Sequence, residues 1–272
     1  MSLKGKVAVL FGAGAIASGY APLFADKGMK LVIVSRGDSA HRLAAEINGR
    51  GGSEVVALNA DASDYYQVGR IFEDTVKRFK RIDIVVNGSG GNSPDATASD
   101  LEGFLNMDPQ APKKMIDNNY TSKWYSMQHY LNYLKSAGHE GSVVNITSMS
   151  GFIPLSKVVH YSAAFAAVEN LTKSMAFVFG HYGYGRVNNL AVGFTVGKQN
   201  RKLLLNDDGT PTPRGKEILA NTSQHRFLTP EEIAPHVLYL ADKKISGAIN
   251  GITLRVDGGF GLISLPQTGY TS

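Results

Sequence analysis

Short apolar runs alternate with longer segments of helical character along the whole chain. The runs are rich in Val, Ile and Leu and are bounded by Gly, Asn, Asp or Ser, as expected for strands of a parallel sheet that is covered on both faces. These runs are Val7–Phe11, Lys30–Ser35, Glu54–Asn59, Ile82–Val86, Ser142–Thr147, Arg186–Val192 and Ile252–Val256. The main helical segments between them are Ile16–Lys27, Tyr66–Phe79, Ala111–Ala137, Tyr161–Phe179 and Thr229–Ala241. The alternation predicts a single α/β domain over residues 1–272, with a doubly wound, seven-stranded and mostly parallel sheet and helices on both faces.

The alternation is interrupted between Thr195 and Arg226. Turn-forming residues, Asn206-Asp207-Asp208-Gly209 and Pro211-Thr212-Pro213, separate short helical pieces there. A long excursion inside a compact domain usually has a functional role, often as a lid. We therefore expect residues 195–226 to form a substrate loop or lid over a site.

Composition and charge exclude several function classes. The net charge of the 272-residue chain is +5, but Lys and Arg are scattered and form no patch for nucleic acid or a membrane surface. There is no cysteine, so thiolate and disulfide chemistry are excluded, and no metal site is assigned. No apolar stretch is long enough to span a bilayer, and the first ten residues lack the apolar region of a signal peptide. We expect a cytoplasmic protein with a small-molecule substrate.

A glycine-rich turn follows the first predicted strand. Residues 12–17, Gly12-Ala13-Gly14-Ala15-Ile16-Ala17, fit the fingerprint G-x-G-x-x-G/A of Rossmann-type dinucleotide-binding domains. Such a turn lets the backbone approach a diphosphate while helix amides point at its negative charge. Gly12, Gly14, Ala15 and Ile16 are therefore candidate cofactor-binding residues. The alternative is a strand-to-helix turn that merely uses glycine.

The end of the second predicted strand bears on the choice of cofactor. An acidic residue there would accept hydrogen bonds from a ribose 2′-hydroxyl, whereas Arg36 suits a 2′-phosphate. NADP is therefore favoured, and NAD remains possible because Asp38 is close by in the sequence. Arg36 could also be a solvated loop charge.

Ser148 and Tyr161 stand thirteen residues apart, at the end of the fifth predicted strand and at the start of a predicted helix, and Asn119 precedes both. With the motifs Asp61-Ala62, Asn87-Gly88-Ser89-Gly90 and Arg186-Val187-Asn188-Asn189-Leu190-Ala191-Val192-Gly193, the chain from Leu3 to Phe260 resembles the short-chain dehydrogenase/reductase family. The resemblance implies an NAD(P)-dependent oxidoreductase that interconverts a carbonyl and an alcohol, and a homotetramer or homodimer. It also implies catalytic roles for Asn119, Ser148 and Tyr161, and cofactor contacts for Asp61, Ala62, Asn87, Gly88, Ser89, Gly193 and Thr195.

One residue departs from the family pattern at its most sensitive point. The family has a lysine four residues after the catalytic tyrosine, and this chain has Phe165. Tyrosine titrates near pH 10, and a nearby ammonium lowers that pKa. Lys123 or Lys157 could supply the charge instead. Otherwise the chain is a catalytically impaired relative that serves as a ligand-binding or subunit protein.

Three segments resemble one branch of the family in particular. Residues 87–97, 199–201 and 212–215 are similar to proteins described as D-mannonate oxidoreductase or fructuronate reductase. This similarity implies a sugar acid as the substrate. Lys198 and Arg201 could pair with its carboxylate, and Asn92 and His160 could reach its hydroxyls. Alternatively, these are charges on a mobile surface loop.

Overall fold

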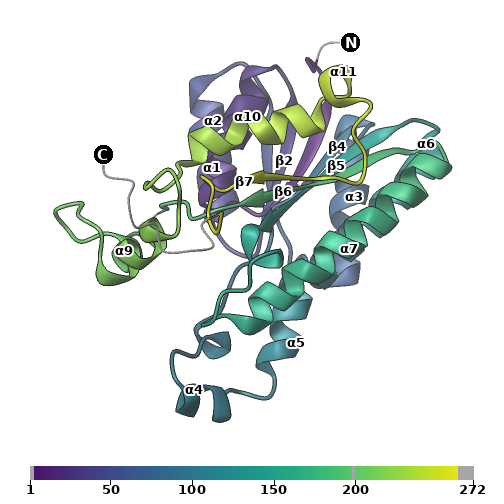
Figure 1. The fold of residues 1–272 in the computed structure, drawn as a ribbon. Helices are drawn as coiled ribbons and strands as arrows, with labels where there is room; N and C mark the ends of the chain where they lie inside the picture. Colours follow the sequence, from purple (N-terminus) through teal and green to yellow (C-terminus); the bar gives the residue numbers. More distant parts are fainter. Residues whose placement is uncertain (1–2, 198–199, 263–272) are drawn as a thin grey trace.

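The computed structural model describes residues 3–197 and 200–262, and within them one sheet of seven strands forms the centre of the molecule (Figure 1). The strand order is β3-β2-β1-β4-β5-β6-β7, and every pair of neighbours is parallel. The predicted doubly wound fold is confirmed. The strands are β1 (Val7–Phe11), β2 (Lys30–Ser35), β3 (Val55–Asn59), β4 (Ile84–Asn87), β5 (Gly141–Ser148), β6 (Gly185–Val192) and β7 (Thr253–Val256).

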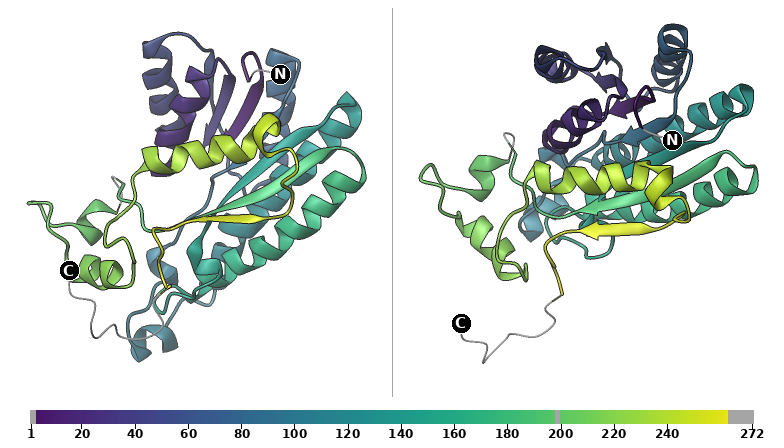
Figure 2. Two further views of the ribbon diagram at one scale, coloured as in Figure 1. Left: turned by 45° about the horizontal axis from the view of Figure 1, so that its top comes forward. Right: turned by 90° about the horizontal axis from the view of Figure 1, so that it is seen from above.

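Helices cover both faces of this sheet (Figure 2). One face packs against α1, α2 and α10, and the other packs against α3, α6 and α7. Successive residues of β1 show why both faces are covered, because Ala8 and Leu10 enter the first core while Val7, Val9 and Phe11 enter the second. The helices are α1 (Ala15–Asp26), α2 (Ser39–Arg50), α3 (Tyr65–Phe79), α4 (Leu101–Leu105), α5 (Ala111–Ile116), α6 (Ser122–Ala137), α7 (Val159–His181), α8 (Arg201–Leu204), α9 (Pro213–Ala220), α10 (Pro230–Ala241) and α11 (Lys243–Ser246).

The segment predicted as one helix over Ala111–Ala137 is divided in the structure. Helix α5 passes at Asp117–Thr121 into a π-helical turn, which continues directly into α6. A π turn closes its hydrogen bonds over one residue more than an α turn, so it is equivalent to an insertion. The prediction of a single regular helix is therefore wrong at this turn, where Asn119 lies.

The strand order reverses direction between β1 and β4. Chain connections leave β1 toward β2 on one side, and β4 lies on its other side. Ligands of open α/β sheets bind at such a switch point, beyond the carboxyl ends of the strands. The loops after β1, β4, β5 and β6 therefore surround one place, and several predicted site residues, among them Gly12, Gly88 and Gly193, lie on these loops.

The excursion predicted over residues 195–226 forms a small lobe at the carboxyl end of the sheet, where Figure 1 shows α9 standing clear of the central layers. A bridge between Thr195 and Leu228 closes its base. Leu204 of α8 and Ile218 of α9 pack with Met149 and Phe260 in a separate apolar cluster, which holds the lobe beside β5. Within the part of the chain that the structure describes, no helix is long and apolar enough to cross a membrane.

Candidate active site

The glycine turn after β1 lies directly against the loop after β4. Gly12 has a φ of +100°, and a Cβ at this position would lie 2.6 Å from the carbonyl oxygen of Gly88. Only glycine fits here, because both the backbone conformation and the space exclude a side chain. Gly14 then begins α1 without a side-chain cap, so the first amides of this twelve-residue helix face the cleft. This is the arrangement that accepts a diphosphate.

One arm of the cleft extends from this turn across the ends of β2 and β3. Arg36, Asp61 and Ala62 line it together with Gly12 and Gly88. The Asp61 carboxylate is held in place by the backbone amide and the hydroxyl of Ser63, at 2.9 and 2.7 Å. Arg36 is exposed and takes part in no ion pair within the described residues. The residues present therefore fit a dinucleotide, and Arg36 adds a cation to the lining of this arm.

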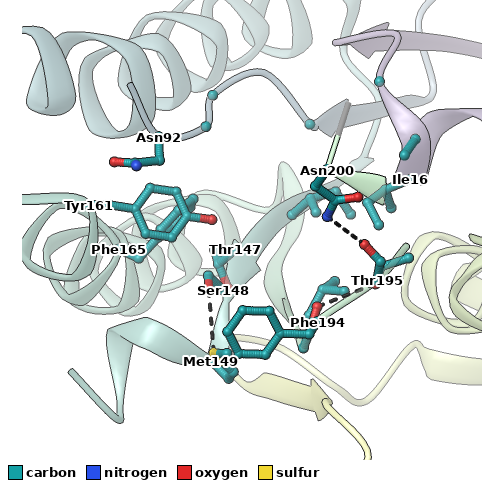
Figure 3. A pocket seen from close by; sticks show the side chains of 18 of the residues that line it. Ile16, Asn92, Thr147, Ser148, Met149, Tyr161, Phe165, Phe194, Thr195 and Asn200 are labelled. Atoms are coloured by element: carbon teal, nitrogen blue, oxygen red, sulfur yellow. Dashed lines mark hydrogen bonds between the residues drawn. The ribbon is translucent and has the colours of Figure 1, made fainter. Parts of the chain in front are cut away.

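A second arm, of about 470 Å³, lies under the lobe and contains two of the three candidate catalytic residues, Ser148 and Tyr161 (Figure 3). Ser148 ends β5, Tyr161 lies in the first turn of α7, and both side chains face this arm. Gly14, Gly88, Ser89 and other residues line both arms, so the two arms form one continuous cleft. A cleft of this size accepts a small organic substrate beside a cofactor.

Burial raises the pKa of the Tyr161 phenol above its ordinary value near 10, and the neighbouring Ser148 hydroxyl opposes that rise. Tyr161 therefore keeps its proton at neutral pH in the absence of a nearby charge. A protonated phenol beside a serine hydroxyl can protonate and hydrogen-bond one oxygen atom.

The Phe165 ring contacts both Tyr161 and a buried lysine. The rings of Phe165 and Tyr161 meet edge to face, with centroids 4.7 Å apart and an interplanar angle of 80°. The Nζ of Lys123 lies 5.4 Å from the centroid of the Phe165 ring. The same Nζ donates a hydrogen bond of 2.9 Å to the carbonyl oxygen of Ser89. Lys123 is 1% exposed, and burial lowers its pKa to about 7.

Two predicted site residues lie below the cleft rather than in it. Asn119 is fully buried, and its amide bonds the backbone of Gly91 and the carbonyl of Met115. Asn87 is buried as well and bonds Asn145 and Ser126. Neither belongs to the lining of the two arms. The remaining predicted residues do line the cleft: Gly12, Gly14, Ala15, Ile16, Arg36, Asp61, Ala62, Gly88, Ser89, Ser148, Tyr161, Gly193 and Thr195.

The lobe contributes one charged side chain to the reaction arm. Arg214, near the start of α9, is the one charged residue among the described residues that line this arm. Its Nη1 lies 2.7 Å from the carboxylate of Glu217, which is largely exposed. Asn92 also faces the arm, beside Tyr161 (Figure 3). Arg201 is exposed, and neither Arg201 nor His160 lines this arm. Lys198 lies outside the described residues.

Comparison with known proteins places this cleft in a family. The family model described as enoyl-(acyl carrier protein) reductase matches residues 12–261. The uncharacterized oxidoreductase UxuB of Bacillus subtilis is 38% identical over 95% of this chain and 96% of its own. A crystal structure with bound NAD, of a Haemophilus influenza protein provisionally assigned as a D-mannonate oxidoreductase, has a TM-score of 0.87 at 30% identity, and the match covers 97% of both chains.

An NADPH-dependent 3-quinuclidinone reductase from Rhodotorula rubra has a TM-score of 0.82 at 25% identity, with 96% of this chain and 93% of that chain covered. These matches span almost the full length of the chain, including the glycine turn, Ser148 and Tyr161. They agree with the fold of the single parallel sheet covered by helices. The chain therefore belongs to the short-chain dehydrogenase/reductase family of oxidoreductases.

Proposed function

We propose that this protein is an NADP-dependent oxidoreductase that interconverts a secondary alcohol and a ketone on a sugar acid. The observation that carries the substrate class is the composition of the reaction arm. Its described lining contains one cation, Arg214, and no carboxylate, beside the hydroxyls of Ser148 and Tyr161. A guanidinium binds a carboxylate through paired hydrogen bonds, and Asn92 can bond the hydroxyls of the sugar chain.

The Haemophilus influenza structure supports the same substrate class, because its description names D-mannonate. It also carries NAD, while the Rhodotorula rubra enzyme is NADPH-dependent, so the relatives use either nucleotide. Arg36, exposed and free of ion pairs in the described chain, supports NADP for this protein. We therefore expect NAD to bind more weakly than NADP.

The catalytic step assigns a separate role to each hydroxyl. In the direction of reduction, the Tyr161 phenol donates its proton to the carbonyl oxygen, and Ser148 donates a hydrogen bond to the same oxygen. The bound nucleotide supplies the hydride. The raised pKa of Tyr161 suits this direction, since the phenol is protonated at neutral pH. Oxidation needs the phenolate instead, and the phenolate requires a nearby positive charge.

The test is a matched panel of substrates with the purified protein. We expect D-mannonate and related aldonates to be oxidised with NADP, their keto acids to be reduced with NADPH, and neutral analogues such as mannitol and fructose to react at least tenfold more slowly. Tyr161→Phe should lower the turnover by about 10² or more. A protein that binds NADPH but converts no member of the panel would instead be a catalytically impaired relative. The observation behind this alternative is that Phe165 replaces the lysine of the family.

A further inference from the structure

Lys123 is a buried cation without a carboxylate partner. It comes from the first turn of α6, it is 1% exposed, and the described residues form no ion pair with it. An ammonium has three donors, and among the described residues this one has a single hydrogen-bond acceptor, the carbonyl of Ser89. Burying a charge without a counterion is costly. The packing of α6 alone therefore does not explain why a lysine is buried at this position.

The ammonium lies immediately beneath the floor of the cleft. Its two contacts, Ser89 and Phe165, both line the reaction arm, and Ser89 also lines the arm that fits the dinucleotide. The preceding residue, Ser122, lines the dinucleotide arm as well. Lys123 is thus placed where the two arms meet, below the side chains that a bound nucleotide would touch.

The groups that face Lys123 leave its charge unbalanced. On α7, the Phe165 ring contacts both Lys123 and Tyr161. The buried carboxylate of Glu169, one turn further along α7, accepts hydrogen bonds from Thr147, Asn189 and Thr253. On its own side, the π turn carries Asp117, which pairs with Lys113 at the surface. The loop after β4 contacts Lys123 through the backbone carbonyl of Ser89.

We propose that Lys123 is the positioning cation of the cofactor cleft: its amine, which α6 places against the Phe165 ring, takes up a proton when an anionic dinucleotide occupies the cleft, and the resulting ammonium provides a positive charge near Tyr161. The inference rests on the proposed function, because the ligand is the nucleotide of that reaction. Lys123 acts through Phe165 and the Ser89 loop and does not line the cleft itself.

Electrostatics gives the direction of this linkage. Burial lowers the pKa of Lys123 to about 7, so in the empty protein the neutral amine is favoured as the pH rises above neutral. The diphosphate of NADPH brings negative charge into the low-dielectric cleft, which favours the ammonium and raises its pKa. The charged ammonium in turn favours the ionised form of Tyr161. Binding of the nucleotide therefore raises the proton affinity of Lys123, and protonation of Lys123 raises the affinity for the nucleotide by the same factor.

The experiment measures proton uptake when NADPH binds at pH 8, by titration calorimetry in two buffers of different ionisation enthalpy. The 2′-phosphate of NADPH is already ionised at this pH. We expect the parent protein to take up a proton fraction approaching one, and its affinity to fall by up to about tenfold per pH unit above pH 8. Lys123→Met should bind NADPH at least tenfold more weakly, without proton uptake and with little dependence on pH.

Further variants separate the charge from the structural contact. Lys123→Gln keeps a donor for the Ser89 carbonyl but has no charge, so it should recover part of the affinity and none of the proton uptake. Phe165→Lys in the Lys123→Met background returns an ammonium to the same space and should restore affinity. In the parent, the same Phe165→Lys change places two cations together and should not improve it. Lys135→Met, at an exposed position of α6, is the matched control.

Undiminished proton uptake in Lys123→Met, or full recovery of the parent's pH dependence in Lys123→Gln, would overturn the inference. The outcome is distinct from that of the proposed function. Proton uptake that depends on Lys123 in a protein without turnover would support the inference and reject the activity. Turnover without such uptake would do the reverse, and failure to bind NADPH or NADH would reject both.

Discussion

Asn119 bonds both backbone polar groups of Gly91, accepting from its amide at 2.8 Å and donating to its carbonyl at 3.1 Å. It therefore holds the loop after β4 from below. We expect Asn119→Ala to weaken NADPH binding by about tenfold and to lower the free energy of unfolding by about 1 to 3 kcal/mol, because buried partners lose their bonds. Fluorescence titration and chemical denaturation measure the two effects. A loss of turnover with normal nucleotide affinity would instead support the proton-relay role that the family resemblance implies.

The hydroxyls of Tyr161 and Ser148 can be removed without disturbing the nucleotide arm. We expect Tyr161→Phe and Ser148→Ala each to lower kcat by about 10² to 10⁴, the range typical for a positioned proton donor or oxyanion contact. The dissociation constant of NADPH should change less than threefold. Steady-state kinetics and nucleotide titration on the same preparations provide both values. Activity that survives in Tyr161→Phe would assign the proton transfer to another group.

Arg214 can be tested for recognition of the substrate carboxylate. Arg214→Met keeps the length of the side chain and removes the charge, so we expect kcat/KM for a sugar acid to fall by about 10- to 100-fold. The slow reaction with the matching neutral polyol should be unaffected. Lys216→Met, at an exposed position of the same helix, is the control. Equal losses on charged and neutral substrates would show that Arg214 acts through the packing of the lobe.

Arg36 is expected to set the preference for the nucleotide. Arg36→Ala removes the guanidinium proposed to bind the 2′-phosphate, so NADPH affinity should fall by about tenfold or more while NADH affinity stays within about twofold. Parallel fluorescence titrations with the two nucleotides test this. If both affinities fall together, Arg36 supports the diphosphate or the loop and does not read the 2′ position.

Lys123 should also leave a signature in the stability of the empty protein. Its pKa is about 7 when folded and near 10.4 when unfolded, so the unfolded chain binds more protons between these values. The free energy of unfolding should therefore rise with pH from about 7 to about 10, by an amount on the order of 4 kcal/mol. Below pH 7 the full penalty for the buried charge remains. Denaturation across this range should give a flatter profile for Lys123→Met, and parallel profiles would show that Lys123 is not desolvated in solution.

The sequence predicted the sheet well, because parallel strands covered on both faces are continuous apolar runs that few other elements resemble. Strand ends were harder to predict. Ile82 was assigned to the fourth strand, but the strand begins at Ile84. The Asp83 carboxylate accepts the amide of Val7, and Ile82 donates its amide to the Tyr133 hydroxyl. These contacts come from segments far away in the chain, and no local pattern carries them.

The candidate site was predictable where the fold constrains the backbone and not where it depends on packing. The glycine turn has its own sequence signature, since Gly12 tolerates no Cβ. Lys123 was only one of two candidates for the missing charge. Lys157, the other, is half-buried and absent from the cleft lining. Arg214 belongs to the segment 212–215, whose sequence resembles one branch of the family. Whether its side chain reaches the reaction arm depends on how the lobe packs against the sheet, which no local sequence pattern predicts. The predicted homotetramer or homodimer stays a prediction.

The π turn at Asp117–Thr121 has a consequence for how such a site can arise. The five residues of this turn advance the side chains about as far as four residues of an α-helix, because a π turn closes over one residue more. If the same residues continued as a regular α-helix, α6 would be rotated by about 100° relative to α5, and Ser122 would point where Lys123 points now. The π turn thus decides which residue lies beneath the floor of the cleft, and the amino acids of α6 need not change.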